Sequence, residues 1–344
     1  MPEPTVRSHP EEPQPVPSGA GAGTAAPAPA PAPEDPGAAS PKEAAPAARP
    51  RRRGAHRRRR ERTRGLWADA WYDLRRNPVF TVSALLILFL LAVAVRPELI
   101  ASRDPLSCDL GRALGGPAPG HWFGFDAQGC DVYTRTVHGA RASIAVAVCA
   151  TLGTALVGGV LGGLAGFFGG WADGVLSRVT DVFFGIPIVL GGLVFLAMVR
   201  AEGIWPVVWV IVALGWPQAA RIARGSVITV RQNDFVQAAR ALGAGSTRIL
   251  VRHVLPNAVA PVIVVMTIAL GTYVALEATL SFLGIGLRPP TVSWGVAISE
   301  ASDGMQFRNA PHILLYPAAA LSVTVLAFIM LGDAVRDALD PKLR

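Results

Sequence analysis

Long apolar segments separated by polar stretches dominate the chain after its first 78 residues. Six of them run over about residues 79–95, 143–168, 182–199, 204–220, 258–283 and 313–332. Each is close to the roughly 20 residues that an α-helix needs to cross a bilayer. The pattern predicts an all-α polytopic membrane protein with six transmembrane helices. Only a few residues around Glu202 join the third and fourth segments, which predicts an antiparallel hairpin.

The first 65 residues have a different composition. Pro, Ala, Gly and Glu dominate residues 1–50, and ten arginines follow within residues 49–64. Such a segment buries too little apolar surface to offset its ordering entropy, so we expect a disordered cytoplasmic tail. No apolar core follows the basic residues, as one would in a signal peptide. The arginine block is either a solvated charge run or a contact for anionic lipid headgroups; nucleic-acid binding is least favoured.

Residues 66–77 are predicted to form a short amphipathic helix at the membrane interface. Its apolar side would carry Leu66, Trp67, Ala70, Trp71 and Leu74. Tryptophan beside basic residues is typical of the boundary between lipid and water. The transmembrane domain then follows as residues 78–344.

The charge is unevenly distributed along the chain. The net charge is +8, of which +5 belongs to residues 1–65 and +3 to the remainder. The basic character is therefore no sign of a nucleic-acid-binding core. With the N-terminus inside, cytoplasmic segments after residue 65 hold 12 Lys and Arg, against 8 in outside segments. Cytoplasmic loops of membrane proteins carry such an excess, so both termini are predicted to be cytoplasmic.

A polar, basic insert at residues 237–257 separates the fourth and fifth apolar segments. It predicts two short helices broken at residues 243–245, with Ser246 or Thr247 capping the second helix and Pro256 ending it. A structured helical elbow in a loop suggests that another protein docks there.

The spacing within this insert resembles a known motif. Ala238 and Ala239 precede Gly243, and nine residues later come His253, a valine, Leu255 and Pro256. This resembles the EAA loop of ABC importer permeases, and its His-x-Leu-Pro-Asn ending is similar to the dipeptide, oligopeptide and nickel branch. The family's glutamate is Gln237 here. The resemblance assigns ATPase coupling to Gln237, Ala238, Ala239, Leu242, Gly243, His253, Leu255, Pro256 and Asn257.

Further stretches extend the resemblance over about residues 66–344. The run from His121 to Val132 is similar to a family motif, with Phe125 in place of a threonine and Cys130 in place of an arginine. Cys108 lies in the same outside loop, so we predict a disulfide between the two cysteines; two free thiols are the alternative. The stretches around Glu277 and Trp294 and the C-terminal segment also resemble this branch.

Two features of the spans have two interpretations each. Glu277 is an ionisable group inside a span, which suggests a place on the translocation path; the alternative is a carboxylate hydrogen-bonded within the bundle. Glycines recur every four residues at Gly158, Gly162, Gly166 and Gly170. They suit close helix packing, with a flexing role as the alternative.

The resemblance implies the type I ABC importer permease fold and a subunit without covalent chemistry. Such a subunit forms half of a path for dipeptides or oligopeptides. Its expected partners are a second homologous permease, two cytoplasmic ABC ATPases, an extracellular solute-binding protein and membrane lipid. The sequence has no P-loop, so ATP and Mg²⁺ would bind to partner subunits, and no cofactor, metal or catalytic residue is expected in this chain.

The alternatives within and outside this class stay open. A permease for nickel or another small solute belongs to the same branch. A membrane-embedded hydrolase would need a nucleophile or metal ligands near His253, and the sequence has neither a Gly-x-Ser-x-Gly nor a His-Glu-x-x-His motif. A secondary transporter would need internal repeats or several buried charges.

Overall fold

The computed structural model describes residues 66–199, 202–302 and 308–339, so the predicted tail lies outside the described residues. These residues form helices and three isolated β-bridges, and no β-strand. The longer helices are α1 (Leu66–Arg76), α2 (Pro78–Val95), α3 (Val132–Phe168), α4 (Gly170–Phe184), α5 (Ile188–Met198), α6 (Ile204–Arg231), α9 (Leu255–Phe282) and α12 (His312–Leu339). The short ones are η1 (Pro97–Leu99), η2 (Leu110–Arg112), α7 (Asp234–Ala241), α8 (Ser246–Ile249), η3 (Leu250–Val254) and α10 (Trp294–Glu300).

Five helical stretches of the described chain are long and apolar enough to cross a membrane, and a bent pair makes a sixth if it counts as one span. That pair is α4 and α5, which meet at 87°. The prediction of one helix over residues 182–199 is therefore wrong in its bounds. Pro187 lacks an N–H and disfavours helix at the residue before it, so the chain turns between Phe184 and Ile188.

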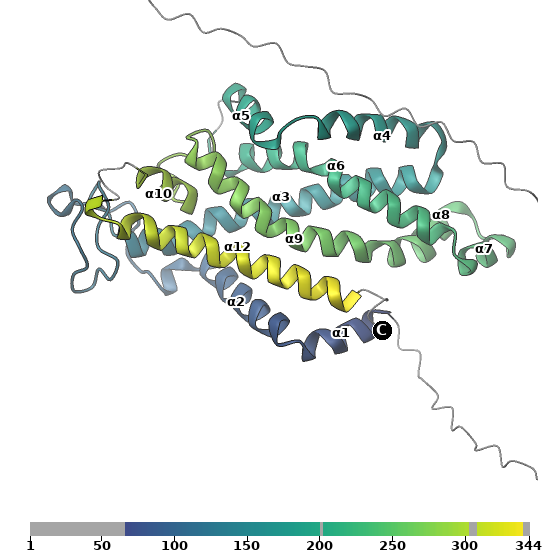
Figure 1. Ribbon diagram of the computed structural model, residues 1–344, viewed down its shortest axis with the longest axis horizontal. Helices are drawn as coiled ribbons and strands as arrows, with labels where there is room; N and C mark the ends of the chain where they lie inside the picture. Colours follow the sequence, from purple (N-terminus) through teal and green to yellow (C-terminus); the bar gives the residue numbers. More distant parts are fainter. Residues whose placement is uncertain (1–65, 200–201, 303–307, 340–344) are drawn as a thin grey trace, which may run out of the picture. The chain divides into compact units, whose positions relative to one another are not determined.

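The long helices pack side by side as a bundle. α6 lies along α3, α9 contacts both of them, and α12 lies between α9 and α2 (Figure 1). Fully buried aliphatic side chains fill the space between α3, α6 and α9, among them Val146, Ile211 and Val274. α5 packs back against α6, with Gly191 close to Leu214, as the predicted hairpin requires.

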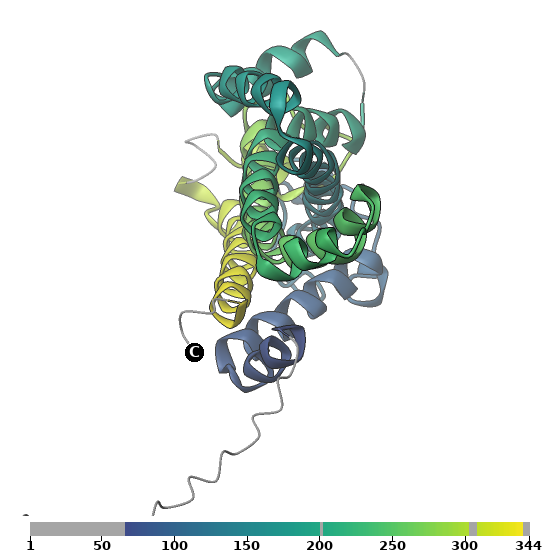
Figure 2. The same ribbon diagram turned by 90° about the vertical axis from the view of Figure 1, so that its right-hand side faces the viewer.

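The connecting segments gather at two ends of this bundle. At one end lie the loop between α2 and α3 and the short helix α10 (Figure 1). At the other end lie α1, α7 and α8, which face the viewer in Figure 2. The predicted interfacial helix and the predicted coupling loop therefore share one end, as their common assignment to the cytoplasmic side requires.

Candidate functional site

The elbow consists of α7, α8 and η3, residues 234–254. Its first arm is α7, which ends in a tight glycine turn. The N–H of Ala244 donates to the carbonyl of Ala239 (3.1 Å), and the N–H of Gly243 donates to the carbonyl of Arg240 (3.0 Å). This pair of bonds is the Schellman motif, which places its cap residue in the left-handed region. Gly243 has a φ of 82°, while a Cβ there would meet nothing within 4 Å. Glycine is needed here for its backbone conformation and not for space within the chain.

The second arm differs from the sequence prediction. α8 begins after Gly245 without a side-chain cap, so neither Ser246 nor Thr247 caps it. Pro256 does not end the helix either. The chain passes through a π-helical turn, η3, into the first turn of α9, which contains Pro256. A wider turn relieves the clash between a proline ring and the carbonyl four residues earlier, so the helix continues.

A small apolar core holds the elbow against the bundle. Val236 of α7 and Val254 of η3 are fully buried, and Ile249 of α8 is 2% exposed. They pack with Leu250 of η3 and with Phe167, Val227, Val230 and Ala258, at the ends of α3, α6 and α9. The elbow is therefore fixed to three spans, so a force on it reaches the bundle.

The outer surface of the elbow combines apolar and basic side chains. Leu242 is 89% exposed, and Phe235 and Val251 are also exposed. Arg240, Arg248 and Arg252 are exposed beside them. Exposed apolar side chains among arginines are typical of surfaces that bind another protein.

The predicted coupling residues fall in two groups. Gln237 to Gly243 lie on α7 and its cap, with Leu242 at the tip. His253 lies in η3, and Leu255, Pro256 and Asn257 form the first turn of α9. Gln237 donates from Nε2 to the carbonyl of Arg231 (3.3 Å), and the Asn257 amide donates to the carbonyl of His253 (2.8 Å). The second group thus lies where the elbow continues into α9 and not at its tip.

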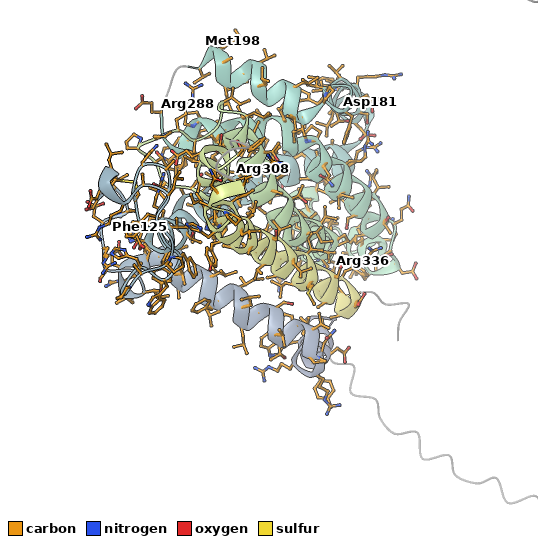
Figure 3. All side chains as sticks on the ribbon, turned by 60° about the vertical axis from the view of Figure 1, so that its left-hand side comes forward. Phe125, Asp181, Met198, Arg288, Arg308 and Arg336 are labelled. Carbon is orange, nitrogen blue, oxygen red and sulfur yellow. A yellow bond between two sulfur atoms is a disulfide. The ribbon has the colours of Figure 1, made fainter. Side chains whose placement is uncertain are left out.

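The structure also shows polar contacts that join α6 to α4 and to the end of α3, and these were not predicted from the sequence. The Arg224 guanidinium pairs with Asp173 of α4 (Nη2 to Oδ2, 2.8 Å), and Arg221 pairs with Asp181 (3.2 Å; Asp181 is labelled in Figure 3). Arg231 donates to the carbonyl of Phe167 (2.6 Å). From the sequence, these arginines count only among the basic residues of the predicted cytoplasmic side. Two aspartates eight residues apart, about two turns of one helix, were the available signal.

Glu277 is enclosed within the chain. It is 0% exposed, and the Ser281 hydroxyl donates to its Oε1 (2.8 Å). The same hydroxyl accepts the N–H of Leu287 (3.0 Å), and Ser143 and Ser293 also lie at the carboxylate. The other oxygen of Glu277, Oε2, is buried without a hydrogen-bond partner among the described residues, so the bond from Ser281 to this carboxylate lies within α9. Its predicted place on a translocation path stays a prediction.

A disulfide, hydrogen bonds and an ion pair hold the loop between α2 and α3 in place. A disulfide joins Cys108 and Cys130. Asp126 accepts the N–H of Cys130 (2.9 Å) and pairs with Arg135 of α3. Phe125, labelled in Figure 3, is 6% exposed, so the residue that replaces the family's threonine is part of the loop's interior.

The exposed Glu98 lies at the start of this loop, in η1. The pKa of its carboxyl is lowered, mainly by a hydrogen bond from its own backbone N–H and further by Arg141, which lies 3.0 Å away. This ion pair joins η1 to α3, and it lies apart from the Asp126 pair.

Comparison with known proteins agrees with this geometry. Residues 158–344 match the model of the binding-protein-dependent transport system inner membrane component, and residues 65–117 match the N-terminal TM domain of oligopeptide transport permease C. The chain is 36% identical over 279 residues to the glutathione transport system permease protein GsiD of Pectobacterium atrosepticum, covering 81% of this chain and 92% of that protein. It is 38% identical over 285 residues to GsiD of Escherichia coli O6:K15:H31, covering 83% and 93%.

The first family model and both relatives cover more than half of the chain, and an inner-membrane component agrees with its apolar helices. The chain belongs to the inner-membrane components of binding-protein-dependent transport systems, as a multi-pass ABC importer permease of the oligopeptide branch.

Proposed function

We propose that this permease forms half of a translocation path for dipeptides or oligopeptides and is coupled to ATPase subunits through residues 237–257. The observation that carries the coupling role is the elbow at Gly243. Its tip is exposed, apolar and basic, while its base is buried among the ends of α3, α6 and α9. A partner that moves the tip would therefore move the spans.

The peptide substrate rests on the family branch. The matched N-terminal model is that of an oligopeptide permease, and the two GsiD relatives are named for transport of glutathione, which is a tripeptide. A small peptide is the substrate class shared by both names.

The proposed assembly contains a second homologous permease, two cytoplasmic ABC ATPases and an extracellular solute-binding protein. The chain lies in the cell membrane with both termini in the cytoplasm, so that the elbow faces the ATPases. ATP and Mg²⁺ bind to the ATPases, and this chain contributes no catalytic residue.

The test changes the turn of the elbow. Gly243→Asp places a side chain and a charge at a positive φ, which costs about 1–2 kcal/mol locally and adds an acidic group to a basic surface. We expect uptake to be lost and less ATPase to co-purify, while the permease stays in the membrane. Uptake of a labelled tripeptide and the ATPase content of affinity-purified complexes measure both effects.

Two variants control this experiment. Gly245 has an ordinary φ of −66° and open space around it, so Gly245→Ala should leave uptake and ATPase binding unchanged. Gln237→Glu restores the family residue and should also be tolerated. Normal uptake by Gly243→Asp, with the ATPase still bound, would show that the elbow does not couple.

A further inference from the structure

A cavity of about 160 Å³ lies at the end of the bundle opposite the elbow. Its polar lining comes from Asp126, Gln128, Arg135, Thr136 and Glu300, and apolar side chains such as Ile313 form the remaining wall. The lining thus combines the disulfide-tied loop, the first turn of α3, the end of α10 and the start of α12. A cavity of this size holds several waters or one small organic group.

Arg135 is the central charge of this cavity. Its side chain is 9% exposed, and its Nη2 lies 2.8 Å from Oε2 of Glu300, while Nη1 pairs with Asp126. Among the described residues that line the cavity, two carboxylates share one guanidinium, so this described lining carries one excess negative charge. Asp126 is fully engaged, because its other oxygen accepts the N–H groups of Gln128 and Cys130 (2.9 Å each).

One buried hydrogen-bonding group at the cavity has no partner among the described residues, and one carboxylate beside it is only partly paired. Nε of Arg135 is buried and has no acceptor among the residues that the structure describes. Glu300 is 25% exposed and pairs, within the same residues, with Arg135 alone through one oxygen. The described lining therefore offers one buried N–H donor, one carboxylate oxygen open to solvent and one excess negative charge. A buried polar group without a partner is costly, so a complementary ligand would be favoured.

We infer that this cavity binds the free amino end of a peptide. The ammonium group meets the Glu300 carboxylate and the excess negative charge, and the first carbonyl oxygen, three bonds from the amino nitrogen, accepts the Arg135 Nε–H. The apolar wall takes a small first side chain. This inference rests on the proposed peptide transport and deepens it, because it names the part of the substrate that is recognised.

Protection of an introduced cysteine tests the inference. Ala297 lines the cavity and is partly exposed, so Ala297→Cys, in a Cys149→Ser background, reports on its occupancy. The importer complex is reconstituted in lipid nanodiscs without its binding protein, and alkylation by a maleimide is timed. Tri-alanine should slow alkylation, whereas N-acetyl-tri-alanine, which lacks the charged amino group, should not. Glu300→Gln should weaken this protection roughly tenfold or more, because a charge-assisted hydrogen bond is lost.

The matched control is Glu98→Gln, which removes a carboxylate of the same end that pairs with Arg141 outside the cavity. It should leave the protection unchanged. Equal protection by both peptides, or none by either, would overturn the inference. Equal protection by ethylammonium, which has no carbonyl, would also overturn it and would point to a lysine side chain of a docked protein. Peptide uptake by the same complex with its binding protein is measured separately, so failure here is distinct from failure of the proposed function.

Discussion

Gly162 of α3 lies directly against the backbone of Ala220 in α6. A Cβ at Gly162 would come within 2.1 Å of the Ala220 carbonyl oxygen. One turn away on each side, a Cβ at Gly158 would come within 2.5 Å of the Trp216 carbonyl oxygen, and one at Gly166 within 2.7 Å of the Arg224 carbonyl oxygen. Glycine thus allows two spans to touch through their backbones, as small residues do in lipid. Gly170, the fourth glycine of the series, follows α3 at a positive φ and is not part of the contact.

This contact predicts a large effect from a single methyl group. Gly162→Ala drives Cβ into a backbone oxygen, which cannot move as a side-chain tip could, so the two helices must separate. We expect a loss of about 1–3 kcal/mol of stability, typical of overpacking. Thermal unfolding of the purified permease in detergent measures it. Gly159→Ala is the control, because a Cβ there meets nothing within 4 Å and alanine favours helix. Equal unfolding midpoints for both variants would contradict the contact.

The enclosed Glu277 allows its two interpretations to be separated. Glu277→Gln keeps the size of the side chain and an oxygen for the Ser281 hydroxyl, so folding should be nearly unchanged. Glu277→Leu leaves the Ser281 O–H without its acceptor, at about 1–3 kcal/mol for a buried group. Thermal unfolding and peptide uptake are measured for both variants. A Gln variant that folds and transports normally supports the structural role, whereas one that folds but does not transport assigns the charge to the path.

Most spans could be predicted from the sequence, because the hydropathy of a segment depends only on the amino acids within that segment. The bounds of the third span were predicted wrongly, because hydropathy carries no information on the direction of the chain. The chain turns by 87° at Gly185 to Pro187. The rule that proline ends a helix also failed at Pro256. Val254 and Ala258 on either side of it are buried in the core under the elbow, and this packing keeps the chain helical.

The residues of the candidate site also fall into two groups: some depend on the local sequence, and others depend on contacts between distant parts of the chain. The turn at Gly243 was predictable, because its cause lies within a few residues of chain. The enclosure of Glu277 was not, because Ser143 and Ser293 reach it from distant parts of the sequence. The pairing of Arg224 with Asp173 also joins residues 51 positions apart, and it depends on how α4 folds back along α6.

The two ends of the bundle should lie on opposite sides of the membrane. Ser102 is exposed in the loop between α2 and α3, and Gln232 is exposed at the end of α6 beside the elbow. Ser102→Cys and Gln232→Cys, each in a Cys149→Ser background, should therefore differ in labelling by an impermeant maleimide. We expect Ser102→Cys to react in intact cells and Gln232→Cys to react only after the cells are opened. Equal labelling of the two positions in intact cells would reject this topology.

The disulfide predicts a local loss of order when its cysteines are replaced. It closes a loop across 22 positions of sequence, which contributes about 3 kcal/mol to the order of that loop in the chain-entropy model. Other ties remain without it, including the hydrogen bond from the Asp109 N–H to the Gly129 carbonyl (3.1 Å). In the Cys108→Ala, Cys130→Ala double variant we expect faster proteolysis between residues 108 and 130. The unfolding midpoint should change little, because the loop lies outside the packed spans.

Cys149→Ser is the control for this variant, because Cys149 is a free cysteine on α3 outside the loop. It should leave the rate of proteolysis in the loop unchanged. Mass spectrometry of non-reduced peptides from the native protein should find residues 108 and 130 joined, since this end of the bundle is assigned to the oxidising side of the membrane. Recovery of both cysteines in alkylated form from the native protein would show that no bond is present. Equal proteolysis of the double variant and the control would show that the bond does not order the loop, because the Asp109 to Gly129 hydrogen bond and the Asp126 contacts would then suffice.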